Sequence, residues 1–266
     1  MQPMRSTERD DGEAGAGQAP VSLLERASLV LGCFEPEHTD IGVSDIARRT
    51  GLAKSTTHRL VVELVRLGLL EESGGGRVRL GLRMFELGQL VPRQRALHEA
   101  ARPFMEDLRE ATGNHVHLAV LDGIEVVYVE ILRARDVQPL PSRVGGRLPA
   151  HATGVGKAIL AFSPPDVVRA RIEAGLSRRT AYTIIMPGAF ARELAAINAS
   201  GISYDRQESA MGVVCAACPV FGADGTVVAG MSVTGRAERL DIERMAPAVR
   251  TAALALSRTL GAPTPT

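Results

Sequence analysis

Three short patterns in this sequence contain residue types that could perform chemistry. Cys215 and Cys218 have the Cys-x-x-Cys spacing of a redox dithiol or of half a zinc site. The run TGVGKA, residues 153–158, combines glycines with a lysine, as phosphate-binding loops do. Asp205 and Glu208 are neighbouring carboxylates, and such a pair can act as general acid and base. Each pattern also has a purely structural explanation, and the surrounding residues decide between the two.

The cysteine pair lies in a segment with the alternation of a β-strand. Residues three apart on a strand point to opposite faces, so Cys215 and Cys218 cannot converge on one partner. No second Cys or His pair with metal-binding spacing follows them. We therefore expect no metal here, and core packing for Cys218. Three cysteines in the whole chain suit a reducing cytoplasm rather than a disulfide framework.

The glycine run does not satisfy a nucleotide-binding motif. A P-loop would need glycine in place of His151 and Ser or Thr in place of Ala158, and GxGxxG would need glycine in place of Ile159. What remains is a glycine turn that opens a helix, whose free N–H groups can hold a carboxylate. His151 could be a pocket group, but a core histidine is the more common case.

The carboxylate pair has no oriented nucleophile to serve. The motifs GxSxG, HExxH and SxxK are all missing from the chain. The sequence therefore predicts no catalytic residues, no metal and no cofactor.

Length and composition predict a two-domain protein. The chain has 266 residues, of which 45% are hydrophobic and 23% charged. Its formal charge is +1, so any nucleic-acid binding must come from a local basic patch. No stretch is apolar over the 18 or so residues that a membrane span needs. Residues 1–20 are polar and rich in Gly, and we expect a disordered tail that is not a signal peptide.

The N-terminal part has the pattern of a winged helix-turn-helix, mostly α with a β wing. Apolar spacing marks the helices, glycines mark the turns, and a glycine-rich tip marks the hairpin. The predicted elements are a helix over 22–34, a loop over 35–41, a helix over 44–50 with Ser44 as N-cap, a turn over 51–53, a helix from Lys54 or Ser55 to Leu67 that Gly68 ends, and a hairpin over 69–80.

Charge supports DNA binding by this part. Between Ser44 and Arg83 eight basic residues face four acidic ones, an excess of four, whereas the whole chain carries +1. The first turns of the second helix of such a motif enter the major groove, and wing arginines mostly contact phosphates. The predicted DNA contacts are Arg48, Lys54, Ser55, Thr56, Thr57, His58 and Arg59, with Arg77 and Arg79 on the wing.

The C-terminal part has the pattern of an α+β domain on an antiparallel sheet. From His115 the apolar period changes to two, and Asp122-Gly123 predicts a tight hairpin turn. A helical stretch over 81–113, with breaks expected at Pro92 and Pro103, precedes it. The predicted elements are hairpins over 115–132 and 212–234, and helices over 154–162, 165–174, 189–199 and 242–260.

Six segments, which together extend over roughly Val21 to Leu260, are distinctive: SLLERASLVLGCF, VSDIARRTGLAKSTTHRLVVELVRLGLLE, RVRLGLRMFELG, AHATGVGKAILA, GISYDRQES and GVVCAACPVFGADGTVVAGMSVTG. In these segments the chain resembles the isocitrate lyase regulator (IclR) family of transcription regulators. The resemblance implies a DNA-binding winged helix followed by an effector-sensing GAF-like α+β domain. The corresponding boundaries are a tail at 1–20, the winged helix-turn-helix at 21–82, a helical linker at 83–112 and the effector-binding domain at 113–262.

The resemblance also implies site residues and partners. The effector, a small carboxylate or aromatic acid, would lie beside the glycine turn, while the protein, a homodimer or homotetramer, binds a near-palindromic operator in double-stranded DNA. A small-acid-binding enzyme with a vestigial winged helix stays open as the alternative function. Leu148, Met211 and Val213 are candidate apolar lining residues. The effector residues implied by the family are Gly154 and Val155, through their N–H groups, with Asp205, Cys215, Ser232 and Thr234.

Overall fold

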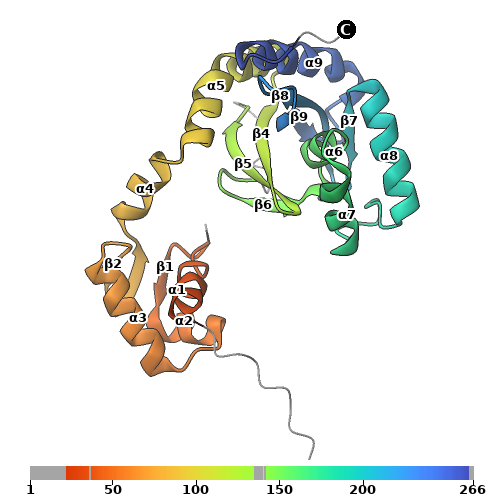
Figure 1. Ribbon diagram of the computed structural model, residues 1–266. Coiled ribbons are helices and arrows are strands. Elements are labelled where there is room, and N and C mark those ends of the chain that lie inside the picture. The colour runs from red at the N-terminus through yellow and green to blue at the C-terminus, as the bar shows by residue number, and fades with distance from the viewer. Residues whose placement is uncertain (1–21, 36, 135–139, 141, 264–266) are drawn as a thin grey trace, which may run out of the picture. The chain divides into compact units, whose positions relative to one another are not determined.

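The computed structural model describes residues 22–35, 37–134, 140 and 142–263. The chain separates into two compact units, one up to Val91 and one from Pro92 onward. We call them the N-terminal and C-terminal units and describe each by itself (Figure 1). The division between them falls inside the predicted helical linker.

The N-terminal unit is a helix-turn-helix with a small sheet, as the sequence predicts. Its sheet has the order β1-β3-β2, with both pairs antiparallel. Buried Val30, Ile46, Leu60, Leu64 and Val78 join the helices to the sheet in one core. In chain order the elements are α1 (Leu23–Leu31), β1 (Asp40–Gly42), α2 (Val43–Thr50), α3 (Lys54–Arg66), β2 (Leu70–Gly74), β3 (Arg77–Leu80) and α4 (Leu82–Gln89).

Two local predictions in this unit were wrong. The segment predicted as a loop contains β1, a strand too short to show a period of two. This strand leads directly into α2, so the helix begins at Val43 with Gly42 as its N-cap and not at the predicted cap, Ser44. The helix that begins at Leu23, by contrast, has a complete capping box between Ser22 and Glu25.

The C-terminal unit is an α+β fold on one antiparallel sheet of order β6-β5-β4-β9-β8-β7. Both predicted hairpins are present, as β4–β5 and β8–β9. Strand β4 of the first pairs with strand β9 of the second at the centre of the sheet. The elements are α5 (Pro92–Thr112), β4 (His115–Asp122), β5 (Glu125–Leu132), β6 (Arg147–Pro149), the 3-10 turn η1 (Ala150–Ala152), α6 (Gly154–Leu160), α7 (Pro165–Glu173), α8 (Pro187–Ser200), β7 (Ser203–Arg206), β8 (Val213–Phe221), β9 (Val227–Arg236) and α9 (Ile242–Thr259).

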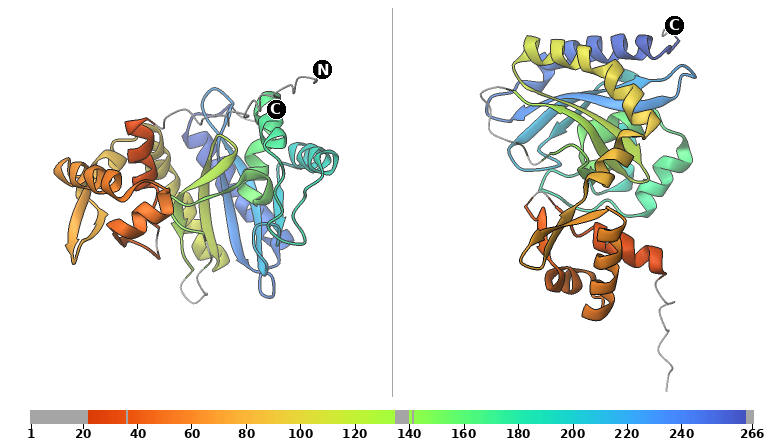
Figure 2. Two further views of the ribbon diagram at one scale, coloured as in Figure 1. Left: turned by 90° about the horizontal axis from the view of Figure 1, so that it is seen from below. Right: turned by 90° about the vertical axis from the view of Figure 1, so that its left-hand side faces the viewer.

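Helices cover both faces of this sheet. Figure 2 shows α5 and α9 side by side on one face, where Met105, Leu118, Met231 and Leu256 are fully buried. On the other face α6 lies directly against the strands, and side chains of α7 and α8 pack around it. The second face carries the polar residues that the sequence singled out, so the fold places them between α6 and the sheet.

Pro103 does not break α5, contrary to prediction. The helix runs through it from Pro92 to Thr112. An interior proline destabilises a helix by about 3 kcal/mol. Leu97, Met105 and Leu108 are buried in the core of this unit, and each contributes about 1.5–3 kcal/mol on burial. Their combined burial therefore outweighs the proline. Pro92, at the start of α5, does mark a break.

Three further boundaries differ slightly from the sequence pattern. Asp122 pairs with Glu125, so the turn consists of Gly123 and Ile124 and lies one residue later than predicted. Short strands β6 and β7 were not predicted as strands, and β7 places Asp205 on the sheet. Within the described residues, no helix is both long and apolar enough to span a lipid bilayer.

Candidate nucleic-acid interface and ligand cavity

The first turns of α3 present an exposed polar and cationic surface. Lys54, Ser55, His58 and Arg59 are exposed, and Thr56 is half-buried. The side chains of Lys54, His58 and Arg59 form no hydrogen bond or ion pair with any described residue. Arg66 at the other end of the same helix is instead paired with Glu63. The amino-terminal end of α3 therefore offers cations that no carboxylate of the described chain neutralises.

Thr57 is the exception among the predicted DNA contacts. It is fully buried, and its hydroxyl donates a hydrogen bond to the carbonyl of Ala53 at 3.2 Å. Its place in the helix, between the exposed Lys54 and the core residue Leu60, turns it inward. We therefore leave Thr57 out of the contact set.

The remaining predicted cations are exposed but paired. Arg48 contacts Asp45 at 2.7 Å, Arg77 contacts Asp40 at 3.2 Å, and Arg79 contacts Glu71. Exposed ion pairs of this kind contribute at most about 1 kcal/mol. A phosphate can therefore compete with the carboxylate for each guanidinium. These arginines are suited to phosphate contacts that orient the unit rather than to base recognition.

All six predicted effector residues line one cavity of about 100 Å³ in the C-terminal unit. Strand register explains why they meet, because Asp205 pairs with Cys215 and Cys215 pairs with Thr234 across β7, β8 and β9. Ser232 lies two residues before Thr234 and points to the same face. The two hydroxyls are 3.1 Å apart. The sheet thus supplies one wall of polar side chains, and α6 supplies Gly154 and Val155 opposite them.

Glycine allows α6 to lie this close to the sheet. A Cβ on Gly154 would overlap the sulfur of Cys215, and one on Gly230 of β9 would lie 2.8 Å from the carbonyl oxygen of Val155. The Thr153 hydroxyl caps the helix by accepting a hydrogen bond from the Gly156 N–H at 3.1 Å. The glycine run is therefore a packing device at the cavity, in agreement with the rejection of a phosphate loop.

Asp205 is buried in the cavity wall and held by its own turn. It accepts hydrogen bonds from the Glu208 N–H at 2.6 Å and from the Ser209 hydroxyl at 2.6 Å. Burial raises the pKa of Asp205 above its ordinary value, while these hydrogen bonds and Lys157 oppose the shift. Burial, with the charge of Asp205, raises the pKa of Cys215 to about 12, so this thiol stays protonated.

Lys157 ties the helix to the same turn. Its side chain is fully buried, and the ammonium is 2.6 Å from Glu208 Oε1 and 2.8 Å from Glu193 Oε1. Burial alone would lower the pKa of Lys157, but the two carboxylates raise it above its ordinary value. Lys157 does not line the cavity; through Glu208 it holds the turn after β7, whose Glu208 N–H and Ser209 hydroxyl bond Asp205.

The cavity also contains polar residues that the sequence analysis missed. His117 on β4, Tyr128 on β5, Ser142 and Arg179 line it together with the predicted set. His117 faces Ser232 across the β4–β9 pair, and the alternation of HVHLAVL places it on one face with His115. That pattern was available in the sequence, but it does not say which face of the sheet forms the cavity.

The other candidate residues have different positions. Leu148 and Val213 line the cavity, whereas Met211 is exposed and does not. His151 is a core residue, since its ring packs against Phe190 and its Nε2 lies 3.0 Å from the Ser177 carbonyl. Cys218 points into the α5–α9 core, away from Cys215, as strand alternation predicts. Within the described residues, no group of His, Cys, Asp and Glu is arranged to hold a metal.

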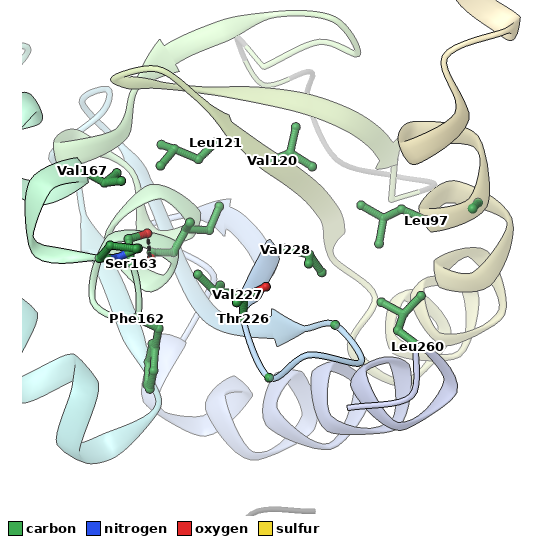
Figure 3. A pocket seen from close by; sticks show the side chains of 15 residues that line it. Leu97, Val120, Leu121, Phe162, Ser163, Val167, Thr226, Val227, Val228 and Leu260 are labelled. Carbon is green, nitrogen blue, oxygen red and sulfur yellow. Dashed lines mark hydrogen bonds between the residues drawn. The ribbon is translucent and has the colours of Figure 1, made fainter. Parts of the chain in front are cut away.

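A second, larger concavity of about 800 Å³ lies at one end of the same sheet (Figure 3). The pairing of β4 with β9 ends at Ala119 and Gly230. Beyond this point β4 remains paired only with β5, and β9 only with β8. Val120 of β4 and Val228 of β9 line opposite sides of the resulting notch. The notch is largely apolar, in contrast to the small polar cavity.

Comparison with protein families matches the two units separately. Residues 23–74 match the IclR helix-turn-helix domain, and residues 90–258 match the C-terminal domain of bacterial IclR transcriptional regulators. The second match alone covers more than half of the chain. Both matches agree with the winged helix-turn-helix and the α+β unit described above.

Full-length relatives support the same assignment. The chain is 32% identical to the HTH-type transcriptional regulator XynR of Escherichia coli over 248 residues, which span 91% of this chain and 98% of XynR. It is 29% identical to the transcriptional repressor IclR of E. coli over 229 residues, covering 85% of this chain and 84% of the repressor.

Solved structures extend this similarity to the fold. An IclR homologue from Microbacterium hydrocarbonoxydans, complexed with 4-hydroxybenzoate, has a TM-score of 0.83 at 33% identity, covering 90% of this chain and 99% of its own. The Thermotoga maritima IclR has a TM-score of 0.72 at 30% identity, covering 90% and 98%. This chain therefore belongs to the IclR family: it is a ligand-binding transcription regulator, not an enzyme, with a DNA-binding helix-turn-helix and an effector-binding C-terminal domain.

Proposed function

We propose that this regulator binds a near-palindromic operator as a dimer or a tetramer, and that a small organic acid changes its affinity for this operator. The single observation that supports this most is the cavity itself, where six residues from α6, β7, β8 and β9 meet between α6 and the sheet. The cations at the start of α3, which have no ion-pair partner among the described residues, support the DNA-binding part of the proposal. Its DNA target places its action in the cytoplasm.

On DNA, α3 would enter the major groove with its amino-terminal end. Arg59 and Lys54 are the strongest candidates for base or phosphate contacts, because they have no ion-pair partner within the described chain. Ser55, Thr56 and His58 complete the helix surface. Arg48, Arg77 and Arg79 would exchange their exposed carboxylate partners for phosphates.

Dimerisation has a physical basis in the N-terminal unit, where two helices expose large apolar side chains. Leu23 and Leu24 on α1 are 69% and 81% exposed, and Phe85 on α4 is 63% exposed. Large exposed apolar side chains favour burial against a partner. A second copy would bring two α3 helices to successive major grooves of a symmetric site.

The effector would lie with its carboxylate toward Gly154 and Val155 and toward Arg179. Arg179 is exposed and is the cation among the described residues that line the cavity. The relative that binds 4-hydroxybenzoate supports an organic acid. Binding changes the DNA-bound population only through a difference in affinity between the DNA-competent state and its alternative.

The test combines DNA binding and ligand binding on the full chain. Fluorescence anisotropy with the upstream region of the protein's own gene should show binding that weakens steeply as salt rises. A thermal-shift screen of small acids should identify an effector that raises the melting temperature, because it binds the native state alone. The same acid should change the DNA affinity of the wild type, and Thr234→Val, which removes a cavity hydroxyl, should weaken that response. No binding to this DNA under any condition would contradict the proposal.

A further inference from the structure

We propose that Tyr128 and His117 are the specificity-determining residues of the cavity, and that they select acids carrying a second, uncharged oxygen such as a hydroxyl, phenol or carbonyl group. This inference rests on the proposed function, since it concerns the effector of the same cavity. The supporting observation is the position of the two residues. His117 on β4 and Tyr128 on β5 lie at the opposite end of the polar wall from Asp205 on β7.

The Tyr128 hydroxyl is available for a ligand. The residue lines the cavity and is 5% exposed, and its hydroxyl hydrogen-bonds to no described residue. A buried tyrosine hydroxyl ordinarily has a partner. Asp205 and Cys215 are close enough to raise the pKa of Tyr128 further after burial has raised it, so the phenol remains a donor. A ligand oxygen in the cavity would satisfy this hydroxyl.

His117 lies beside Tyr128 and lines the same end of the cavity. Its Nε2 is 3.4 Å from the Ser142 hydroxyl and its Nδ1 is 3.4 Å from the Thr234 hydroxyl. Its ring meets the edge of Tyr128 with centroids 5.3 Å apart. Burial, with the nearby His115 and Arg133, lowers the pKa of His117 to about 3, so the ring is neutral. The neutral ring donates one hydrogen bond and accepts one, but it cannot balance a negative charge.

The distribution of charge around the cavity separates the two ends. Arg179 is placed beside the β7 turn, because the next residue, Thr180, donates a hydrogen bond to the Gln207 carbonyl. Strands β8, β9 and β4 lie between β7 and Tyr128 on β5. Arg133 is near His117 but does not line the cavity, so among the described lining residues no cation faces a ligand at the Tyr128 end. A single carboxylate is therefore stabilised at one end, and a second carboxylate is not stabilised at the other.

Cavity size allows the prediction to be tested with small compounds. About 100 Å³ is less than the 150 Å³ or so of an apolar cavity that holds benzene, so acids of a few heavy atoms fit without change. Glycolate and acetate form the smallest pair that differs by one hydroxyl. The pair 4-hydroxybenzoate and benzoate makes the same comparison for an aromatic acid, which would require the cavity to widen.

The experiment is calorimetric titration of the full chain with both pairs of acids. In at least one pair the wild type should bind the hydroxy acid about tenfold more tightly than its partner, because the partner leaves buried polar groups unpaired. Malonate, with a carboxylate in place of the hydroxyl, should bind more weakly than glycolate. Tyr128→Phe should reduce the preference to less than about threefold, and His117→Leu should reduce it as well.

Tyr182→Phe serves as the matched control, since Tyr182 is 56% exposed and does not line the cavity. It should keep the wild-type preference. Melting temperatures near the wild-type value would show that Tyr128→Phe is folded, so that a reduced preference reports the lost hydroxyl and not unfolding. Equal affinities for both members of each pair in the wild type would overturn this inference and leave the proposed effector class intact. Absence of binding by every acid would overturn both.

Discussion

The two lysines of this chain occupy opposite environments, one in each unit. Lys54 opens α3, is exposed, and has no ion pair within the described residues. Lys157 is fully buried on α6 and touches two glutamates. The ammonium group of Lys54 is therefore available to an external anion, whereas that of Lys157 is part of an internal ion-pair network.

The α3 surface and the ligand cavity differ in the same way as the two lysines, in exposure to water. The α3 surface consists of side chains in water, where each charge is screened by salt and contributes independently of its neighbours. The cavity consists of buried groups joined by hydrogen bonds, so that removing one leaves another unsatisfied. Substitutions should therefore cost little stability in the first region and much in the second, while DNA affinity should respond in the reverse order.

Removing the buried lysine should have the largest effect. Lys157→Met leaves Glu208 and Glu193 without their cation, and breaking a buried ion pair by removing one partner destabilises a protein by about 3–5 kcal/mol. Lys54→Met, an exposed substitution, should change stability by less than about 0.5 kcal/mol. Urea unfolding followed by circular dichroism measures both. Equal stabilities of the two variants would show that the buried network does not hold the unit together.

Removing an exposed cation should have the next largest effect, and on DNA affinity rather than stability. Arg59→Ala should weaken operator binding by about 1–3 kcal/mol if the guanidinium contacts a base, or lower the salt slope by about one if it contacts a phosphate. Arg66→Ala is the matched control on the same helix, because Arg66 is at the far end and paired with Glu63. Anisotropy titrations at several salt concentrations separate these cases. If both variants lose affinity equally, the amino-terminal end of α3 has no special role.

Sequence alone predicted the elements whose causes are local. The helices and both hairpins followed from apolar periodicity and turn residues, as Gly68 at the end of α3 and Gly123 in the β4–β5 turn illustrate. Strands β1, β6 and β7 were missed because three or four residues are too few to show a period. Pro103 was misjudged because the burial of its neighbours on α5 is a tertiary effect.

The residues of the candidate site that the family resemblance named could be predicted. Those whose position depends on contacts with residues distant in sequence could not. Lys157 is 36 and 51 residues from the glutamates that hold it, and no local pattern joins them. Tyr128 and His117 were found only after the register of β5, β4 and β9 placed them on the cavity face. Thr57 was included wrongly because helix position alone did not reveal that it faces the core.

The smallest expected effect concerns Asp205, the buried acid of the cavity. Because burial raises its pKa above the ordinary value, the proton is retained to a higher pH than in an exposed aspartate. A protonated Asp205 does not repel an anionic effector, so effector affinity should increase as the pH is lowered toward that raised pKa and decrease above it. One linked proton changes affinity by at most about tenfold per pH unit.

Asp205→Asn should remove this pH dependence, because the amide is neutral throughout. His117, with a pKa of about 3, Cys215, with a pKa of about 12, and Lys157, with a raised pKa, do not titrate near neutrality. Burial also raises the pKa of the adjacent Glu208, so Glu208 is the other carboxyl whose proton is weighed against that of Asp205. Calorimetric titration of the effector at several pH values measures the slope in both proteins. A slope that persists in the asparagine variant would assign the proton to another group, and the acid in the cavity would then resemble Lys157 in being structural rather than functional.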